Sequence, residues 1–145
     1  MPIRIAARAV LIHDALLLLV NAYPAGTSDL WCAPGGGADM HSGLPENLAR
    51  EVYEETGLSI DVGAPCLINE FHSTALGFHQ VEVFFRCSLR EGALSDDWND
   101  PDGVVTQRRW FSQADLQTVR LKPDSLPDIA FRDGIAYDSL ETITR

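Results

Sequence analysis

Basic residues are scarce in this sequence, and their scarcity limits the partners that it can bind. Its 145 residues include 11 Lys and Arg against 21 Asp and Glu, a formal net charge of -10 at pH 7. A surface that follows the phosphates of a long nucleic acid needs clustered positive charge. The charge balance therefore argues against double-stranded DNA as a partner and disfavours long RNA.

Paired cysteines are missing as well. The three cysteines, Cys32, Cys66 and Cys87, are odd in number and widely spaced, without a CxxC pair. This pattern predicts neither a disulfide framework nor a zinc knuckle, and it fits a reducing cytoplasm. Because a chain of this length can bury a sufficient core without a metal, we expect any bound metal to serve chemistry.

Long hydrophobic runs do not occur. The longest, residues 15–20, is far shorter than the roughly 20 residues that span a bilayer, and no stretch resembles a signal peptide. No repeat, low-complexity tract or linker divides the chain. We therefore predict that residues 1–145 form a single cytoplasmic domain that does not bind membranes.

The hydrophobic pattern predicts an α/β fold. Leu44, Leu48 and Val52 recur at helical spacing, Pro45 suits a first helical turn, and Gly57 suits the residue after the last turn. Alternating apolar residues indicate strands elsewhere. The predicted elements are strands over 3–12 and 15–20 joined by a turn, a glycine-rich loop ending at 37, a helix over 44–56, strands over 59–62, 66–73 and 79–89, an exposed acidic loop over 91–102, a strand over 104–111, a short helix that begins after 112, and a last helix within 124–137.

Three carboxylates converge on the predicted helix. At about 100° per residue, Glu51, Glu54 and Glu55 share an arc of about 100°. Like charges at this spacing, near a helix C-terminus, are destabilising. An ordinary solvated face is the alternative interpretation, but the preceding glycine-rich loop and the adjacent Arg50 favour a site where a hard divalent cation meets phosphate.

The segment from residue 35 to 58 resembles the signature of Nudix hydrolases, G-x5-E-x7-R-E-U-x-E-E-x-G-U, where U is a bulky aliphatic residue. Ser42 stands where the signature has Glu, and Asp39 and Glu46 are the candidates to replace its carboxylate. The resemblance implies an α/β/α sandwich with a central mixed β-sheet. The positions that match in register are Gly36, Arg50, Glu51, Val52, Glu54, Glu55, Gly57 and Leu58.

The resemblance also implies roles for these residues. Glu51, Glu54 and Glu55 would bind Mg2+ or Mn2+, with the backbone carbonyl of Gly35 as a further ligand, and Arg50 would orient Glu51. The metal would neutralise a diphosphate and lower the pKa of an attacking water. One of Glu54 or Glu55, or an acid from another loop, would accept the proton of that water.

Residues outside the signature are candidates for contacts with the substrate. For the additional acid, we rank Glu91 and the acids of residues 96–102 above Glu82, because loops carry catalytic groups more readily than mid-strand positions. Trp98 is a candidate to stack on a base. Each of these side chains also has an ordinary structural interpretation. The predicted substrate-binding residues are Arg8, His79, Glu91 and Trp98.

The predicted function is that of a metal-dependent pyrophosphohydrolase that cleaves a nucleoside diphosphate linked to another moiety, X. Its partner would be a small nucleoside diphosphate derivative, and a homodimer is left open. One alternative is a nucleotide-binding or sensor module that has lost efficient hydrolysis. Another is a prenyl diphosphate isomerase on the same scaffold. The signature positions phosphates and metal, so it does not identify X.

Overall fold

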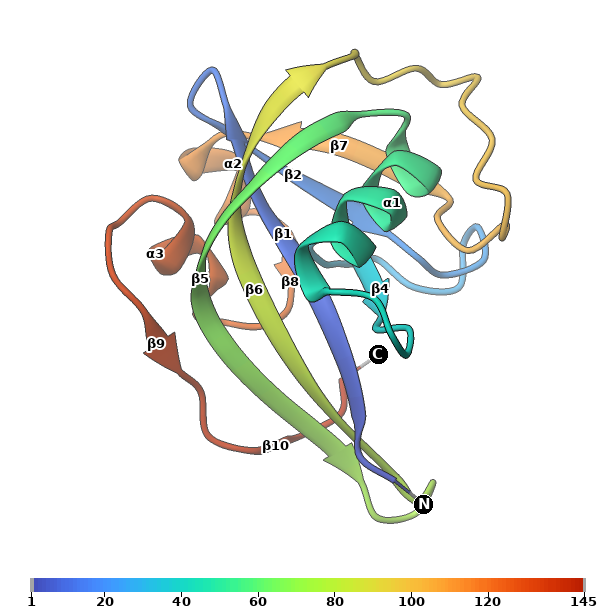
Figure 1. Ribbon diagram of the computed structural model, residues 1–145, viewed down its shortest axis with the longest axis vertical. Coiled ribbons are helices and arrows are strands. Elements are labelled where there is room, and N and C mark those ends of the chain that lie inside the picture. Colours follow the sequence, from blue (N-terminus) through green and yellow to red (C-terminus); the bar gives the residue numbers. More distant parts are fainter. Residues whose placement is uncertain (1, 145) are drawn as a thin grey trace.

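The computed structural model describes residues 2–144, and within that range the chain forms ten strands and three helices (Figure 1). The strands are β1 (Arg4–His13), β2 (Leu16–Asn21), β3 (Leu30–Trp31), β4 (Gly35–Gly37), β5 (Ser59–Ser73), β6 (Phe78–Glu91), β7 (Gln107–Phe111), β8 (Arg120–Leu121), β9 (Ala136–Tyr137) and β10 (Glu141–Thr142). The helices are α1 (Leu44–Thr56), α2 (Gln113–Leu116) and α3 (Leu126–Ala130).

The main sheet is mixed. Its strands follow the order β10-β5-β6-β1-β2-β7, with β4 paired to β1 and β9 to β5. The long strands β5 and β6 form an antiparallel hairpin, while β1 runs parallel to β6 from the Arg4–Gln80 pair to the Leu11–Cys87 pair. The glycines of β4 lie antiparallel to β1, with Gly36 opposite Ala7. Through this pairing, the glycine-rich segment lies directly beside the centre of the sheet.

Helices cover both faces of this sheet, as the alternating side chains of β1 show. Ala7, Ala9 and Leu11 pack with Leu48 and Val52 of α1 in one buried cluster. The opposite face of the sheet contributes to a second buried cluster, which includes residues of α2 and α3. Since successive side chains of a strand point to opposite faces, the two clusters lie on opposite sides. The predicted α/β/α sandwich is confirmed, and Figure 1 shows α1 lying across its face of the sheet.

Helix α1 begins and ends where the sequence predicts. Pro45 occupies its first turn, and Gly57 ends it in a left-handed conformation with φ of 77°. The Gly57 N–H donates to the Tyr53 carbonyl at 2.8 Å, an αL-type ending that suits glycine. None of the helices in the described part of the chain is long and apolar enough to cross a membrane.

Several predicted boundaries were wrong. The separate strands over 59–62 and 66–73 are the single strand β5, because irregular pairing with β6 around Pro65 lets the strand continue past the turn-forming residues. The strand predicted over 104–111 begins only at Gln107. The glycine-rich loop contains the short strands β3 and β4. The 91–102 loop is not wholly exposed, since Asp100 within it is buried.

Candidate active site

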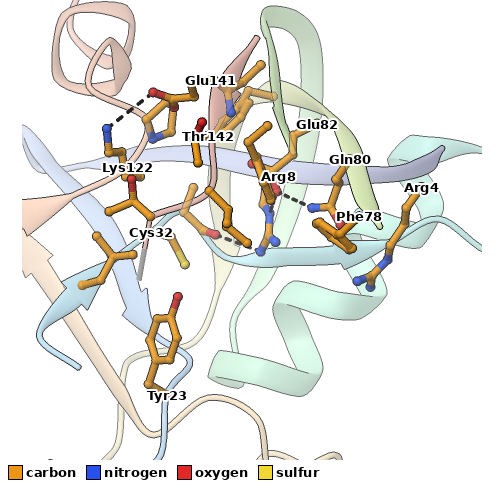
Figure 2. Close-up of a pocket in the computed structure, with 18 residues that line it drawn as sticks. Arg4, Arg8, Tyr23, Cys32, Phe78, Gln80, Glu82, Lys122, Glu141 and Thr142 are labelled. Carbon is orange, nitrogen blue, oxygen red and sulfur yellow. Dashed lines mark hydrogen bonds and ion pairs between the residues drawn. The ribbon is translucent and has the colours of Figure 1, made fainter. Parts of the chain in front are cut away.

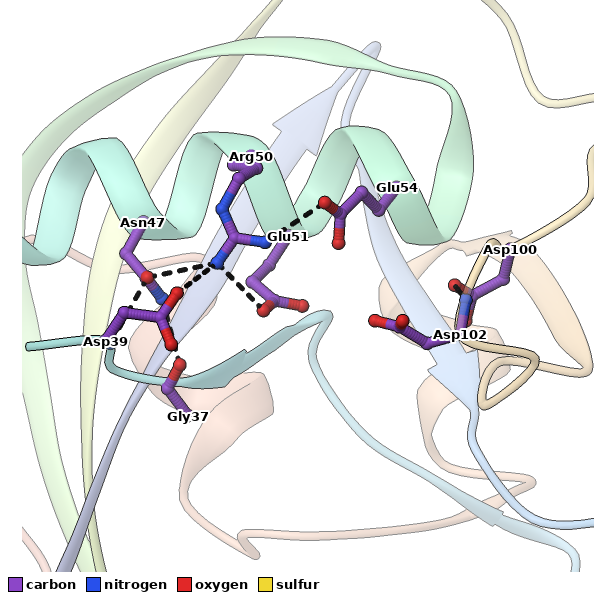
Figure 3. Close-up of polar contacts among 8 residues, drawn as sticks. All are labelled: Gly37, Asp39, Asn47, Arg50, Glu51, Glu54, Asp100 and Asp102. Carbon is purple, nitrogen blue, oxygen red and sulfur yellow. Dashed lines mark hydrogen bonds and ion pairs between the residues drawn. The ribbon is translucent and has the colours of Figure 1, made fainter. Parts of the chain in front are cut away.

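Three carboxylates from two separate segments meet beside α1. One oxygen each from Glu51, Glu54 and Asp102 lie within 4.8 Å of one another, and Figure 3 shows Asp102 facing α1 from the acidic loop. Burial raises the pKa of Glu51, with the charges of Glu54 and Asp102 adding to this effect and Arg50 opposing it. Convergent carboxylate oxygens are the ligands that Mg2+ and Mn2+ prefer. This donor set therefore fits a divalent cation.

Arg50 lies beside this cluster and joins it to the glycine-rich loop. Its guanidinium donates to Glu54 at 3.0 Å and to Asp39 at 2.7 Å, and a longer contact of 3.3 Å reaches Glu51. The sequence predicts the contact with Glu51. Of the two acids considered as replacements at the position of Ser42, Asp39 makes the contact with Arg50.

Asn47 holds the same loop in place, and sequence reasoning missed it. Its side chain is buried, donates to the Gly37 carbonyl at 3.0 Å, and accepts from the Asp39 N–H at 3.3 Å and from Arg50 at 3.2 Å. A buried amide one turn before Glu51 fixes the loop to α1 through polar contacts. In the sequence, the signal for this role is that a polar residue lies next to the apolar stripe of the helix.

The glycines of β4 allow the loop to approach the carboxylates closely. A Cβ at Gly36 would lie 2.8 Å from the Glu51 carboxyl carbon. Gly35 has φ of 148°, and a Cβ there would lie 2.1 Å from the Ala7 carbonyl oxygen. A side chain at either position would displace Glu51 or disrupt the β1–β4 pairing. Both positions therefore need glycine.

Glu55 lies in the same cleft but outside the group of three oxygens. Its carboxylate is buried and accepts a hydrogen bond from the Gly35 N–H. Burial raises the pKa of Glu55 to about 8, with Arg8 opposing the shift and Glu51 adding to it. The N–H of Gly35 thus contacts the site, while the predicted metal contact of the Gly35 carbonyl stays a prediction.

Asp100 shapes the loop that carries Asp102. Its carboxylate accepts from the backbone N–H groups of Asp102, Val104 and Val105 at 3.0, 3.1 and 2.9 Å. Three backbone donors to one buried carboxylate fix the loop locally. This explains why Val104 and Val105 lie outside the strand predicted there.

Arg8 lies on the wall of the cleft and is tied to Glu82 (Figure 2), and its predicted contact with the substrate stays a prediction. The Arg8 guanidinium donates to the Glu82 carboxylate at 2.7 Å. Burial opposes the charge on Arg8, but the carboxylates of Glu82 and Glu55 raise its pKa overall, so it stays a cation. Glu82 is occupied by this ion pair, whereas Asp102 of the 96–102 loop reaches the cluster. The ranking of the acid that would accept the proton stays a prediction.

The other predicted contact residues lie away from the three-oxygen cluster. Trp98 covers the end of α1: its ring lies against Gly57, and its Nε1 donates to the Glu54 carbonyl at 2.8 Å. Glu91 is exposed at the end of β6. His79 pairs across the hairpin with His72, and its Nε2 lies 3.9 Å from Glu70.

A cleft lies beside the glycine-rich loop and the acidic cluster. It runs from the glycines of β4 past the acidic cluster to the ends of β1 and β2. The lining residues are Arg4, Arg8, Val20, Ala22, Tyr23, Cys32, Gly35, Gly36, Gly37, Glu51, Glu55, Asp100, Asp102, Val104 and Val105. Fold and site together define an α/β/α sandwich domain with an acidic cluster, able to hold a divalent cation, beside a glycine-rich loop.

Comparisons with known proteins give the family. The family model described as NUDIX domain matches residues 2–130, and this chain belongs to that family. It is 31% identical over 106 residues to the mouse (Mus musculus) diphosphoinositol polyphosphate phosphohydrolase 3-alpha, a match that covers 73% of this chain and 59% of the relative. The chain thus corresponds to little more than half the length of that relative.

Solved structures confirm the fold. A UDP-X diphosphatase superposes with a TM-score of 0.74 at 19% identity, covering 95% of this chain and 68% of the other. A NUDIX hydrolase from Nitrosomonas europaea superposes with a TM-score of 0.73 at 21% identity, covering 88% and 86%. The resemblance to Nudix hydrolases that the sequence predicts is confirmed.

Proposed function

We propose that this domain is a Mg2+- or Mn2+-dependent pyrophosphohydrolase that cleaves a nucleoside diphosphate linked to another moiety, X, by attack of water on phosphorus. The observation that carries this proposal is the convergence of Glu51, Glu54 and Asp102 within 4.8 Å. Without a cation, this cluster of carboxylates would repel a diphosphate. A divalent cation bound by the carboxylates would offset that repulsion.

In this proposal Glu51, Glu54 and Asp102 hold the metal, which supplies neutralisation of phosphate charge and a lowered pKa for a bound water. Arg50 positions Glu51 and Glu54 through its hydrogen bonds, and Asp39 anchors Arg50. These contacts keep the carboxylates fixed before a ligand arrives.

We assign three further charged groups of the cleft to the reaction at phosphorus. Glu55 lines the cleft beside the metal cluster without belonging to it. Burial favours its protonated form, and a cation bound at the cluster would favour the carboxylate, so we assign the carboxylate of Glu55 to accept the proton of the attacking water. Arg4 and Arg8 line the same cleft and are assigned to the phosphate oxygens.

The names of the relatives suggest two kinds of organic group. By their names, one of these proteins acts on diphosphoinositol polyphosphates and another acts on UDP-X. The net charge of -10 favours a substrate whose charge is confined to its diphosphate, since every further phosphate needs a further cation. This supports the nucleoside diphosphate derivative.

Hydrolysis of a panel of nucleoside diphosphate derivatives and diphosphoinositol polyphosphates, with Mg2+ or Mn2+ and product identification, tests the proposal. We expect a nucleoside monophosphate or a phosphate product from the nucleotide panel, lost in Glu54→Gln and retained in Glu46→Gln. Glu46 is an exposed acid of the same helix outside the cluster. Unchanged turnover in Glu54→Gln, or hydrolysis of the inositol substrates alone, would overturn the proposal.

A further inference from the structure

The segment that carries Asp102 is joined to the end of α1 on both sides of that residue. The indole Nε1 of Trp98 donates to the Glu54 carbonyl at 2.8 Å, and the Nε of Arg108 donates to the Glu55 carbonyl. Two consecutive carbonyls of α1 thus bind side chains that precede and follow Asp102 in the sequence. The same two residues of α1 carry carboxylates of the cluster and of the cleft.

These carbonyls are available because α1 ends there. Gly57 turns the chain into a left-handed conformation, so the last carbonyls of the helix lack the N–H groups of a following turn. The Gly57 N–H donates to the Tyr53 carbonyl, which leaves the carbonyls of Glu54 and Glu55 for donors from other segments. The positive charge of Arg108 also suits the negative end of the helix dipole.

Trp98 fits closely against the end of α1. A Cβ at Gly57 would lie 2.8 Å from Cε3 of the indole, and the ring of Tyr53 packs edge-on with ring centroids 5.4 Å apart. Gly92, at the start of the same loop, approaches the helix end as well, since a Cβ there would lie 3.1 Å from the Gly57 carbonyl oxygen. Packing therefore holds the indole in the orientation that its hydrogen bond needs.

Arg108 connects α1, the sheet and the loop. Its backbone belongs to β7 and pairs with Val20 of β2, so the sheet holds the residue in place. Its Nη2 donates to the Val105 carbonyl at 3.4 Å, and the Val105 N–H donates to Asp100 at 2.9 Å. A guanidinium presents several donors in a rigid plane, which suits carbonyls on two separate segments.

Asp100 shapes the loop but does not place it against α1. Its hydrogen bonds to three backbone N–H groups all lie within the loop. All of residues 92–106 are described, and they form neither helix nor strand (Figure 1). At the end of the loop, the Thr106 N–H donates to the Asn21 carbonyl at 2.8 Å, which ties the loop to β2. The position of Asp102 relative to α1 therefore depends on contacts that reach the helix itself.

We propose that Trp98 and Arg108 are positioning residues of the acidic cluster. Their hydrogen bonds to α1 hold Asp102 where its carboxylate can join those of Glu51 and Glu54. Neither side chain belongs to the group of three oxygens, so each acts through Asp102. The inference rests on the proposed function, because it explains how the third carboxylate is in place before a divalent cation binds.

Trp98→Phe and Arg108→Lys test the proposal without metal, since one keeps a ring and the other a charge while each disturbs the bonds to the carbonyls. Hydrogen exchange of the whole chain in EDTA should show the amides of residues 102–105 exchanging about tenfold faster in each variant, with those of β1 unchanged. Arg109→Lys, at an exposed position of the same strand, should exchange as the wild type does. Unchanged rates at 102–105 in both variants, or equally faster exchange in β1, would overturn the proposal.

A second experiment asks whether the effect passes through Asp102. Titration with Mn2+, followed by the electron paramagnetic resonance signal of the free ion, should show about tenfold weaker binding in Trp98→Phe and in Arg108→Lys. Adding either substitution to Asp102→Asn should weaken binding no further. A residue that only stabilises the fold would weaken binding by the same factor in both backgrounds. Equal factors, or unchanged affinity in both single variants, would overturn the proposal.

The same measurements separate this inference from the proposed function. If the wild type binds Mn2+ and hydrolyses a nucleotide while the factors are equal in the two backgrounds, the positioning role fails and the hydrolase proposal stands. If the wild type neither binds Mn2+ nor hydrolyses any nucleotide, the hydrolase proposal fails, and the metal-site role of Trp98 and Arg108 fails with it.

Discussion

Asp39 Oδ2 lies 2.7 Å from the guanidinium of Arg50, on the loop side of α1 where the Nudix signature has Glu and this chain has Ser42. The same guanidinium contacts Glu51 and Glu54. A carboxylate three residues before the signature position thus takes a place beside Arg50, held by the contact of its own backbone N–H with Asn47.

Asp39→Asn should lower kcat/KM of the metal-dependent reaction by about tenfold, the usual effect of removing a residue that supports a metal ligand. Its effect on the free energy of unfolding should be below about 1 kcal/mol, because the pair is solvent-exposed. Steady-state kinetics and urea unfolding measure the two effects. Ser42→Glu in the Asp39→Asn background should restore part of the rate; an Asp39→Asn enzyme with full activity would contradict this role.

Gly36→Ala should weaken divalent metal binding by about tenfold or more while the chain still folds, because its Cβ would lie 2.8 Å from the Glu51 carboxyl carbon. Gly43→Ala is the matched control, since a Cβ there meets only Pro45, at 3.9 Å. Titration with Mn2+ followed by calorimetry measures the affinity. Equal affinity in the two variants would show that Glu51 does not depend on the space at Gly36.

Trp98→Ala should lower the free energy of unfolding by about 2 kcal/mol. Its ring packs on Gly57 and Tyr53, and its Nε1 donates to the Glu54 carbonyl. Trp98→Phe keeps a ring but loses the hydrogen bond, about 1 kcal/mol. Urea unfolding measures both changes. Unchanged stability with a raised KM would instead support the base-stacking role that the sequence suggests.

His41→Gly should stabilise the protein by about 1 kcal/mol, because His41 has φ of 69°, a conformation that is strained for residues with a side chain. His41→Ala should bring no such gain. Thermal unfolding of the two variants checks the difference, and a destabilised His41→Gly would mean that the imidazole makes a compensating contact.

The sequence predicts the part of the site that lies within one continuous segment. The spacing of Glu51, Glu54 and Arg50 follows from helical periodicity and the signature, and Gly57 marks the helix end as observed. Asp102 comes from a loop far along the chain, where it is one of five acids in residues 91–102. No local pattern distinguishes it from its neighbours, because its position depends on hydrogen bonds that Asp100 makes with the loop backbone.

Long-range pairing explains the other differences. The register of β5 against β6 brings Asn69 beside Gln80, and in the sequence each is only a polar residue within an alternating strand. The irregular pairing near Pro65 keeps β5 continuous where local turn signals predict a break. Both features are set by the register of β5 against β6, which neither strand encodes by itself.

The most direct test of the central claim is a titration of Mn2+ followed by the electron paramagnetic resonance signal of the free ion. The proposed site predicts that the wild-type chain binds the ion, that Glu54→Gln and Asp102→Asn each weaken binding by about tenfold or more, and that Glu46→Gln binds as the wild type does. Equal Mn2+ affinity in all four proteins would contradict a metal site formed by Glu51, Glu54 and Asp102.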